Sequence, residues 1–383
     1  MAMFFVGMAA TDIYVSSLPQ MVKDFATTEA HVNLTLSVYF IGIAVSVLVV
    51  GELSNRYGRR SITLIGVAAY AIASFVIAFS PSLELIIAMR LIQAFGGAII
   101  VIVPRLLLKD CLDEQEQIAA NGVLLIGLIL SPAIAPVIGA YLAKLFGWRS
   151  CFMFSGLMSA ILVIIGYKIL PETNQNLLPR FHSLTHYKIL YTQVITDKVF
   201  WILSLIYASA VGAFFTFIGI SSYLYIDHWH MSPELYASLY LWMSFAYLAG
   251  NQIMQFLNKQ SVIPSSIIRI GVFSTFIGLI IILSSLIFSS TTQIVLVTGG
   301  VIFLRAANAL IAPPTQIKIM KFFDKSSAQA LGLNMCLGFM CSSFATSIVS
   351  LFVQVPLFGL IIVSSLFILV CIATFILGYK HIK

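Results

Sequence analysis

Twelve long apolar runs constrain the fold of this chain more than any other feature of its sequence. A helix needs about 20 mostly apolar residues to cross the roughly 30 Å hydrocarbon core of a bilayer. Because lipid offers the backbone no hydrogen-bond partners, runs of this kind must be helical, and they are too continuously apolar for barrel strands. The runs are Ala2–Pro19, Val32–Gly51, Ile62–Phe79, Leu83–Leu108, Ile118–Phe146, Cys151–Leu170, Val199–Ile226, Leu235–Leu257, Ile267–Phe288, Ile294–Ile319, Ala328–Phe352 and Leu357–Leu377.

The scarcity of charge excludes a water-soluble protein. Only 9% of the 383 residues are charged, 60% are hydrophobic, and the mean hydropathy is +1.03. Soluble domains carry roughly 25% charged residues, so most of this surface is expected to face lipid. The sequence therefore predicts an all-α integral membrane protein with twelve transmembrane helices. The first run contains Asp12 and follows no basic residue, so we interpret it as a retained helix rather than a signal peptide.

The basic residues predict the topology of the chain in the membrane. If the N-terminus is cytoplasmic, most of the 21 Lys and Arg residues fall in cytoplasmic loops. The opposite side receives only Lys23, Lys144 and Arg149, and Arg90 and Arg305 lie inside apolar runs. This asymmetry indicates that both termini are cytoplasmic. It also accounts for the net charge of +7 without a nucleic-acid partner.

The longest polar stretch divides the chain into two six-helix halves. We expect an N-terminal half over residues 1–170, a cytoplasmic linker with one short surface helix over 171–198, and a C-terminal half over 199–383. Two such halves are typical of secondary transporters built from repeats, which bind substrate near the membrane midplane. Because no loop contains a Gly-rich phosphate-binding motif, transport driven by ATP is not expected.

The histidines and cysteines indicate no metal or other cofactor. His182 and His186 lie in the linker, and the segment Asp227–His230 follows the seventh run. Both groups are interpreted as solvated loops, since a metal site needs a fuller set of ligands. The five cysteines form no CxxC pair, and we interpret them as free thiols that act as small apolar residues.

Asp12 is the only acidic residue well inside a predicted helix. An ionised carboxylate at the membrane centre costs at least about 2.5 kcal/mol, so we expect Asp12 to face the bundle interior, pair with a cation or bind a proton. Burial favours the protonated form, and a nearby cation favours the ionised form. This competition is sufficient to exchange a proton for a cationic substrate. The alternative is a structural hydrogen bond near a helix end.

The two arginines within apolar runs stay charged and therefore need a carboxylate, carbonyl oxygens or water. Arg90 is expected either to be linked to Asp12 or to brace backbone carbonyls, and Arg305 is expected to contact the substrate or its cavity. Aromatic side chains at similar depth could stack on a substrate or hold a cation, although packing in the core or at the lipid interface is equally open to them. The candidate substrate contacts are Arg305, Tyr14, Tyr39, Phe214, Phe217, Tyr223, Tyr247, Asn251 and Asn334.

Several motifs resemble those of the major facilitator superfamily. The stretch from Gly51 to Arg60 is similar to the superfamily motif G-x-L-x-D-R-x-G-R-R, and Arg90-Leu-Ile-Gln93 resembles its fourth-helix R-x-x-Q-G motif. Pro132-Ala-Ile-Ala135-Pro136-Val-Ile-Gly139 resembles the fifth-helix motif of antiporters, and Leu170-Pro-Glu-Thr173 resembles the phrase that closes the sixth helix. Asp12-Ile-Tyr14 with Pro19, Gly147-Trp148-Arg149 and Phe152 resemble the bicyclomycin-resistance (Bcr/CflA) branch.

The resemblance implies a proton-coupled antiporter that exports drugs from a bacterial inner membrane by alternating access. Asp12 would carry the proton with Arg90 as its partner, and Pro132, Ala135, Pro136 and Gly139 would shape the antiporter helix. Asn55 stands where the family has Asp, so we expect a weaker inner gate. A siderophore or metabolite transporter, exporting or importing, is the first alternative, and a polytopic enzyme or receptor is a remote one. The expected inner gate comprises Gly51, Asn55, Arg56, Gly58, Arg59, Arg60 and Asp110.

Overall fold

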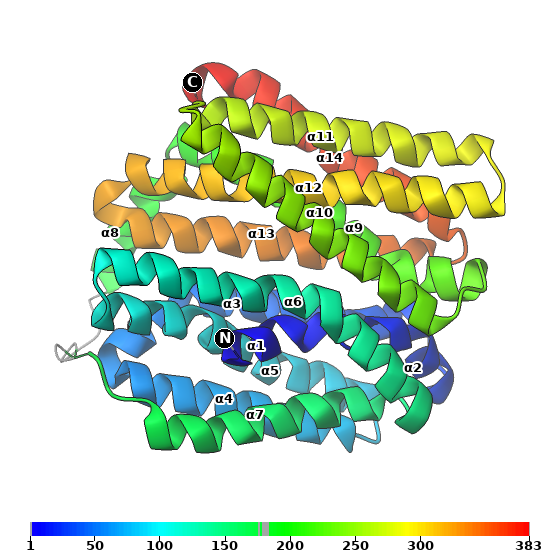
Figure 1. The fold of residues 1–383 in the computed structure, drawn as a ribbon, viewed down its shortest axis with the longest axis horizontal. Helices are drawn as coiled ribbons and strands as arrows, with labels where there is room; N and C mark the ends of the chain where they lie inside the picture. Colours follow the sequence, from blue (N-terminus) through cyan, green and yellow to red (C-terminus); the bar gives the residue numbers. More distant parts are fainter. Residues whose placement is uncertain (1, 175–176, 178–183, 383) are drawn as a thin grey trace. The chain divides into compact units, whose positions relative to one another are not determined.

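The computed structural model describes residues 2–174, 177 and 184–382, and all regular structure in these residues is helical (Figure 1). The prediction of an all-α protein is therefore confirmed for this part of the chain. Arg180 and His182 of the expected linker lie outside the described residues.

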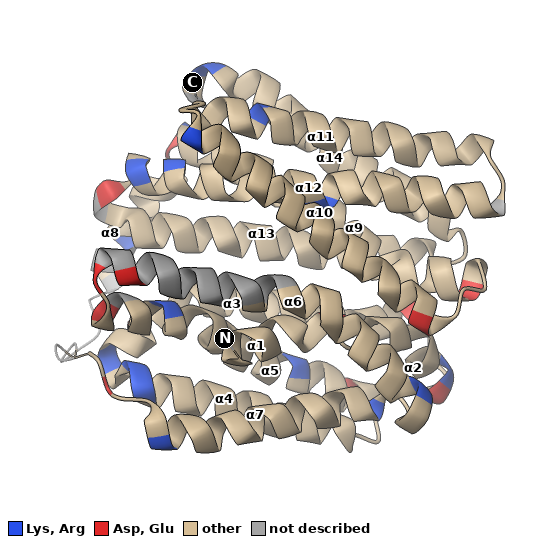
Figure 2. Ribbon diagram, in the orientation of Figure 1, with Lys and Arg blue, Asp and Glu red and all other residues tan. Residues whose placement is uncertain are grey.

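Many of the helices are long and apolar enough to cross a membrane. Ten spans in the described residues meet this criterion, and Leu130–Phe146 is a shorter apolar stretch. Two predicted runs, Ile118–Phe146 and Leu235–Leu257, fall in helices outside these ten. Figure 2 shows that the helix shafts carry few charged residues and that most charges lie at helix ends. The protein is thus a multi-pass membrane protein.

The chain forms two compact units, which are described separately. Unit 1 comprises Met1–His182 and Pro233–Tyr240, and unit 2 comprises Ser183–Ser232 and Leu241–Lys383. The helices of unit 1 are α1 (Ala2–Asp12), α2 (Leu18–Asp24), α3 (Glu29–Tyr57), α4 (Arg59–Ala78), α5 (Leu83–Cys111), α6 (Glu114–Phe146) and α7 (Arg149–Ile169). Those of unit 2 are α8 (Leu184–Ile195), α9 (Lys198–Ser222), α11 (Pro264–Ser284), α12 (Ser290–Phe322), α13 (Ser327–Val349) and α14 (Pro356–Ile382). Helix α10 (Pro233–Lys259) begins in unit 1 and continues in unit 2.

Polar side chains at the helix starts fix several boundaries. The side chain of Thr28 accepts a hydrogen bond from the His31 amide at the start of α3, and Ser82 accepts one from Leu85 at the start of α5. Asp113 and Glu116 form a reciprocal capping box at the start of α6. Such caps satisfy amide groups that have no partner inside the helix. The short helix expected in the linker is α8.

The first membrane crossing is interrupted, whereas the sequence predicted one continuous helix over Ala2–Pro19. Helix α1 ends at Asp12, a 3-10 turn spans Val15–Ser17, and α2 runs from Leu18 to Asp24. Pro19 lies in the first turn of α2. A proline is tolerated there because the amide it lacks would have no partner inside the helix. The crossing therefore continues past Pro19 instead of ending at it.

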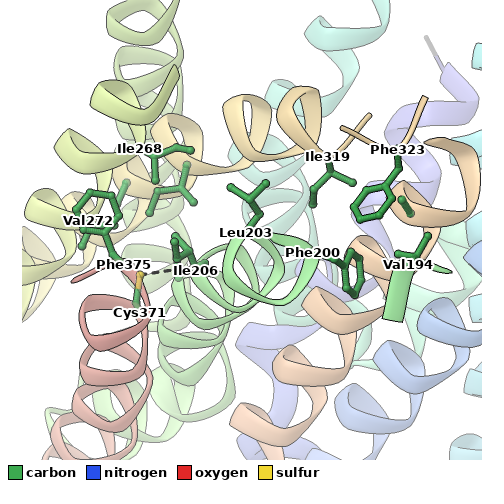
Figure 3. Close-up of a cluster of buried hydrophobic side chains, with 14 residues drawn as sticks. Val194, Phe200, Leu203, Ile206, Ile268, Val272, Ile319, Phe323, Cys371 and Phe375 are labelled. Carbon is green, nitrogen blue, oxygen red and sulfur yellow. Dashed lines mark hydrogen bonds between the residues drawn. The ribbon is translucent and has the colours of Figure 1, made fainter. Parts of the chain in front are cut away.

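Unit 2 is held together by an apolar cluster along α9 (Figure 3). Phe200, Leu203 and Ile206 of α9 pack with buried residues of the neighbouring helices. Cys371 lies in this cluster, and its thiol donates to the carbonyl of Ile206 at 3.6 Å. All five cysteines lie in the described residues as free thiols. Cys371 contributes as a small packing residue, as buried thiols generally do.

The two units repeat one pattern of helix packing. In unit 1, α1 packs against α5, α6 and α7, and α4 packs against α5 and α7. In unit 2, α9 packs against α12, α13 and α14, and α11 packs against α12 and α14. In each unit the first crossing therefore packs against the fourth, fifth and sixth, and the third crossing packs against the fourth and sixth. Helices α5 and α12 are the fourth crossings of their units and so hold equivalent positions.

Candidate functional site

Arg90 of α5 lies at the centre of unit 1 and is fully buried. Its Nε donates to the carbonyl of Thr35 in α3 at 3.0 Å, and its Nη1 donates to the carbonyl of Ala10 in α1 at 3.0 Å. Nη1 also donates to Oε1 of Gln93 at 2.6 Å. The sequence left two roles open for Arg90, a link to Asp12 or hydrogen bonds to backbone carbonyls. These contacts show that Arg90 binds backbone carbonyls. One arginine thus ties together the first, second and fourth crossings.

Three aromatic rings surround the Arg90 guanidinium. Its Cζ lies 4.1 Å from the ring centre of Tyr39, 4.9 Å from that of Tyr14 and 5.9 Å from that of Phe152. Such contacts stabilise a desolvated cation. The Tyr14 hydroxyl shares a hydrogen bond with Oγ1 of Thr35 at 2.9 Å. Tyr14 and Tyr39, expected as substrate contacts, are buried packing partners of Arg90 in this structure.

Asp12 stands at the interruption of the first crossing, two residues beyond the carbonyl that Arg90 binds. Its side chain is partly exposed, its Oδ1 accepts a hydrogen bond from Oγ1 of Thr11 at 3.3 Å, and it lies within electrostatic range of the Tyr39 hydroxyl. The last carbonyls of a helix have no partner inside the helix. The carboxylate therefore lies where the backbone of the first crossing is least constrained by its own hydrogen bonds.

Helix α6, which contains the motif from Pro132 to Gly139, packs against the interruption of the first crossing. A Cβ atom at Gly139 of α6 would overlap the carbonyl oxygen of Ile13, so only glycine allows the two backbones to approach this closely. Ala135 and Pro136 are buried in the same helix, and Pro132 is partly exposed. The motif thus places a backbone-to-backbone contact one residue from Asp12.

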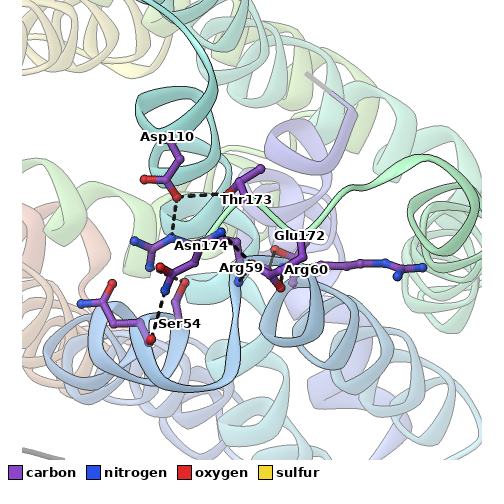
Figure 4. Close-up of polar contacts among 9 residues, drawn as sticks. Ser54, Arg59, Arg60, Asp110, Glu172, Thr173 and Asn174 are labelled. Carbon is purple, nitrogen blue, oxygen red and sulfur yellow. Dashed lines mark hydrogen bonds and ion pairs between the residues drawn. The ribbon is translucent and has the colours of Figure 1, made fainter. Parts of the chain in front are cut away.

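A polar network surrounds the turn between α3 and α4 (Figure 4). The buried Arg59 forms an ion pair between its Nε and Oδ2 of Asp110 at 2.9 Å, and its Nη1 donates to Oγ of Ser54 at 2.8 Å. Oδ2 of Asp110 also accepts from Oγ1 of Thr173 at 3.1 Å. We call this group, with Gly58, Arg60, Glu172 and Asn174, the α3–α4 cluster.

Glu172 places both carboxylate oxygens at the start of α4. Oε1 accepts from the Arg59 amide at 2.8 Å, and Oε2 accepts from the Arg60 amide at 3.1 Å. An anion at a helix N-terminus satisfies free amides and complements the helix dipole. Gly58, with φ +90°, precedes these amides, and a Cβ atom there would collide with the Glu172 carboxylate.

The other predicted gate residues lie around this cluster. Nη2 of Arg60 donates to the carbonyl of Tyr167 at 2.8 Å, and the carbonyl of Asn55 accepts from Nδ2 of Asn174 at 3.0 Å. The Arg56 guanidinium lies 5.3 Å from the ring centre of Tyr57, and Gly51 has open space around its Cβ position. Sequence reasoning omitted Glu172, Thr173 and Asn174 from the site, although the phrase Leu170–Thr173 was the signal that could have found them.

Arg305 of α12 forms a second aromatic cluster in unit 2. Its Cζ lies 4.5 Å from the ring centre of Phe214 in α9 and 4.7 Å from that of Tyr247 in α10. Arg305 and Tyr247 are partly exposed, and Phe214 is buried. Three predicted substrate contacts therefore come together in one unit.

The remaining candidates of unit 2 lie outside this contact set. The buried Phe217 ring is 6.5 Å from the Phe214 ring, and Tyr223 is buried directly after the end of α9. Asn251 is partly exposed, one turn beyond Tyr247. Nδ2 of the buried Asn334 donates to Oγ of Ser204 at 3.0 Å. The structure thus brings only some of the candidates to an arginine: Tyr14 and Tyr39 to Arg90 in unit 1, and Phe214 and Tyr247 to Arg305 in unit 2, among the described residues.

An all-helical membrane protein with two units of repeated packing and a buried arginine in the fourth crossing of unit 1 belongs to the class of multi-pass membrane transporters. The family model of the Major Facilitator Superfamily matches residues 1–349. The chain therefore belongs to the Major Facilitator Superfamily.

Two bacterial proteins are among the relatives of this chain. An "Uncharacterized transporter" of Rickettsia bellii (strain RML369-C) is 28% identical over 279 residues, which are 73% of this chain and 69% of the relative. A "Chloramphenicol resistance protein" of Pseudomonas aeruginosa is 26% identical over 347 residues, which are 89% of this chain and 80% of the relative. The fold is similar to the crystal structure of a POT family transporter in complex with 5-aminolevulinic acid, with a TM-score of 0.78, 12% identity, and coverage of 100% of this chain and 96% of the other.

Proposed function

We propose that this protein is a proton-coupled exporter of drugs or related small molecules that works by alternating access. Membership of the Major Facilitator Superfamily and the relative named for chloramphenicol resistance support export of small molecules. We place the protein in a bacterial inner membrane with both termini in the cytoplasm. The proposed organisation is twelve crossings, with halves over 1–170 and 199–383 joined by a linker over 171–198.

Assignment to the bicyclomycin-resistance branch is part of the proposal. The residues that match the motifs of that branch lie close together in the structure, and this supports the assignment. The Tyr14 and Phe152 rings lie 4.9 Å apart, and the Trp148 and Phe152 rings lie 6.1 Å apart. Nε1 of Trp148 donates to Oδ2 of Asp24 at 2.8 Å. These residues connect the start of α7 with the interrupted first crossing and with Arg90.

The observation that carries the coupling proposal is the position of Asp12 relative to Arg90. Arg90 holds the carbonyl of Ala10, and Asp12 ends the same helix two residues later. The Nη2 atom of Arg90 is buried and has no hydrogen-bond partner among the described residues. A buried donor without an acceptor attracts negative charge. Loss of a proton from Asp12 supplies that charge, and binding of a proton removes it. The hydrogen bond from Arg90 to the carbonyl of Ala10 in α1 therefore depends on whether Asp12 is protonated.

The α3–α4 cluster is the proposed inner gate. Its ion pair and helix cap join α3, α4, α5 and the segment after α7. In the proposed cycle these contacts hold the outward-facing state and break in the inward-facing state. Protonation of Asp12 from outside releases the substrate, and deprotonation inside admits the next molecule.

The experiment that tests this function uses proteoliposomes with a trapped pH-sensitive dye and an imposed proton gradient. Chloramphenicol, the cation ethidium and an iron-free siderophore are added in turn to wild type, Asp12→Asn and Asp12→Glu. We expect substrate-dependent proton flux in wild type, none in Asp12→Asn and partial flux in Asp12→Glu, which keeps the titratable group. Asp324→Asn removes an exposed acid elsewhere and should keep wild-type flux. Equal flux in wild type and Asp12→Asn would reject Asp12 as the proton site.

A further inference from the structure

Basic residues lie at one end of three helices of unit 2 (Figure 2). Lys259 is the last residue of α10, Arg269 lies in the second turn of α11, and Lys380 lies in the last turn of α14. Helix α10 leads into α11 through the short loop over residues 260–263. We call Lys259, Arg269 and Lys380 the α11–α14 basic cluster.

The packing beneath this cluster brings the start of α11 and the end of α14 together. Ile268 and Phe375 belong to the buried apolar cluster along α9 (Figure 3), and Tyr379 packs against that cluster. Arg269 follows Ile268 in the chain, and Lys380 follows Tyr379. Because α11 also packs against α14, the two basic residues lie at the same end of this helix pair.

Arg269 is an exposed cation on an otherwise apolar face of α11. It lies about 8 Å along the helix from its start at Pro264, and Ile270 and Phe273 beside it are exposed and apolar. Within the part of the chain that the structure describes, Arg269 has no hydrogen bond, ion pair or ring contact. A charged side chain in the wall of a transmembrane helix is costly unless it reaches the membrane interface and meets an anion. The partner of Arg269 therefore has to come from outside the protein.

Unit 2 has few carboxylates that could balance the cluster. After Glu234, Asp324 is the only acidic residue of the sequence, and it lies in a turn that packs on α8, α12 and α13. Asp197 caps the start of α9. Lys259 and Lys380 are exposed and, among the described residues, have no partner either. The cluster thus presents its positive charges to the surroundings of the protein.

The bilayer supplies anions at this level. Helix α11 is long and apolar enough to span a membrane, so its first turns lie close to the lipid headgroups. In the proposed topology these turns are on the cytoplasmic side, where basic residues between transmembrane helices bind the headgroups of acidic lipids. The exposed apolar side chains that follow Arg269 on α11 suit the acyl chains of the same molecule.

We propose that the α11–α14 basic cluster binds the phosphate of an anionic phospholipid. Arg269 is the central contact, because its guanidinium fork matches phosphate oxygens, and Lys259 and Lys380 add charge without fixing the geometry. This site goes beyond the proposed transport function and does not depend on proton coupling.

The test measures lipid binding to the full-length protein by native mass spectrometry. The probes are phosphatidylglycerol, which is anionic, and phosphatidylcholine with the same acyl chains, which carries no net charge. Each basic residue near the headgroup should contribute about fivefold in affinity, so wild type should prefer phosphatidylglycerol roughly a hundredfold. Arg269→Gln should lower this preference by about fivefold or more.

Two further variants separate this site from charge elsewhere on the protein. Arg269→Lys keeps the charge and should retain most of the preference. Arg105→Gln makes the same replacement in α5 of unit 1, where the guanidinium stacks on Phe4, and should retain all of it. In phosphatidylcholine nanodiscs Arg269→Gln should melt at the wild-type temperature or above, because it removes a charge that has no partner there. This measurement also shows that the variant is folded.

Equal binding of the two lipids to wild type would overturn the site, and so would a wild-type preference in Arg269→Gln. A lower melting temperature of Arg269→Gln in phosphatidylcholine would assign Arg269 a contact within the protein and would also overturn it. If inorganic phosphate raised the melting temperature as much as phosphatidylglycerol does, the ligand would be a free anion and the lipid proposal would be wrong. Asp12→Asn should keep the lipid preference, so failure of the coupling proposal would leave this one standing.

Discussion

Gly139 of α6 lies directly against the carbonyl of Ile13, the residue that follows Asp12. The contact joins two backbones, so neither side can yield by rotating a side chain. It lies at the interruption of the first crossing, where α1 has ended and the 3-10 turn has yet to begin. The position of the proposed proton-binding residue therefore depends on a glycine 127 residues away in the sequence.

Gly139→Ala should destabilise the protein and abolish transport. Overpacking a well-packed interior costs about 1–3 kcal/mol, and here the obstacle is a backbone oxygen. Thermal unfolding followed by size-exclusion chromatography would measure the loss. Gly299→Ala is the matched control, since a Cβ atom there meets only the Ile281 side chain at 3.9 Å. Equal stability of the two variants would show that the contact with Ile13 is not tight in the membrane.

Arg90→Lys should lower stability and transport although it keeps the charge. A lysine ammonium cannot hold the carbonyls of Ala10 and Thr35 together with Gln93, and each buried acceptor left without a donor costs about 1–3 kcal/mol. Melting temperature and proton flux are the measurements. Arg105→Lys makes the same replacement at an exposed position of the same helix and should behave like wild type. Full flux in Arg90→Lys would mean that charge alone suffices.

The helices were predictable because a bilayer forces apolar runs into one kind of structure. The interruption after Asp12 was not, because it involves contacts made by Gly139 and Arg90, which are remote in sequence. Asp12 and Arg90 could be selected by the cost of burying charge. The role of Tyr14 and Tyr39 could not be predicted. A sequence does not distinguish an aromatic residue that packs against a buried arginine from one that faces a substrate.

Glu172 illustrates a different limit of sequence analysis. Its partners at the start of α4 are backbone amides, one of them 113 residues away. Every residue except proline has a backbone amide, so the sequence does not mark the ones that bind Glu172. The charge cluster of Arg59 with Asp110 was expected because the resemblance to the superfamily implies it. Helix caps formed by distant segments therefore escape prediction even when the motif containing them is noticed.

Gly58→Ala and Glu172→Ala should each destabilise unit 1, and together they should cost less than the sum. Alanine at positive φ costs roughly 1–2 kcal/mol, and at Gly58 its Cβ also displaces the Glu172 carboxylate. Removing Glu172 relieves that collision, so a double-mutant cycle should give a coupling of about 0.5–3 kcal/mol. Unfolding temperatures of the four proteins provide the measurement.

The control cycle pairs Gly58→Ala with Glu84→Ala. Glu84 is an exposed acid in the first turn of α5 and does not meet a Cβ atom at Gly58. These two changes should be additive. If the effects of Gly58→Ala and Glu172→Ala on the unfolding temperature were additive too, the Glu172 carboxylate would not lie over Gly58.

Asn55→Asp should strengthen the proposed inner gate. Asn55 lies three residues before Gly58, and its carbonyl already accepts from Asn174 of the α3–α4 cluster. Asn55 lies in the last turn of α3, where the dipole of α3 disfavours an anion, so the gain has to come from the positive end of the α4 dipole. An anion there gains about 0.3–1 kcal/mol, which corresponds to a roughly two- to fivefold shift in the conformational equilibrium. Distances between spin labels on the two halves should therefore show a larger outward-facing fraction. Asn258→Asp introduces the same charge at an exposed position of α10 and should leave the distances unchanged. An identical distance distribution in wild type and Asn55→Asp would mean that the missing aspartate does not weaken this gate.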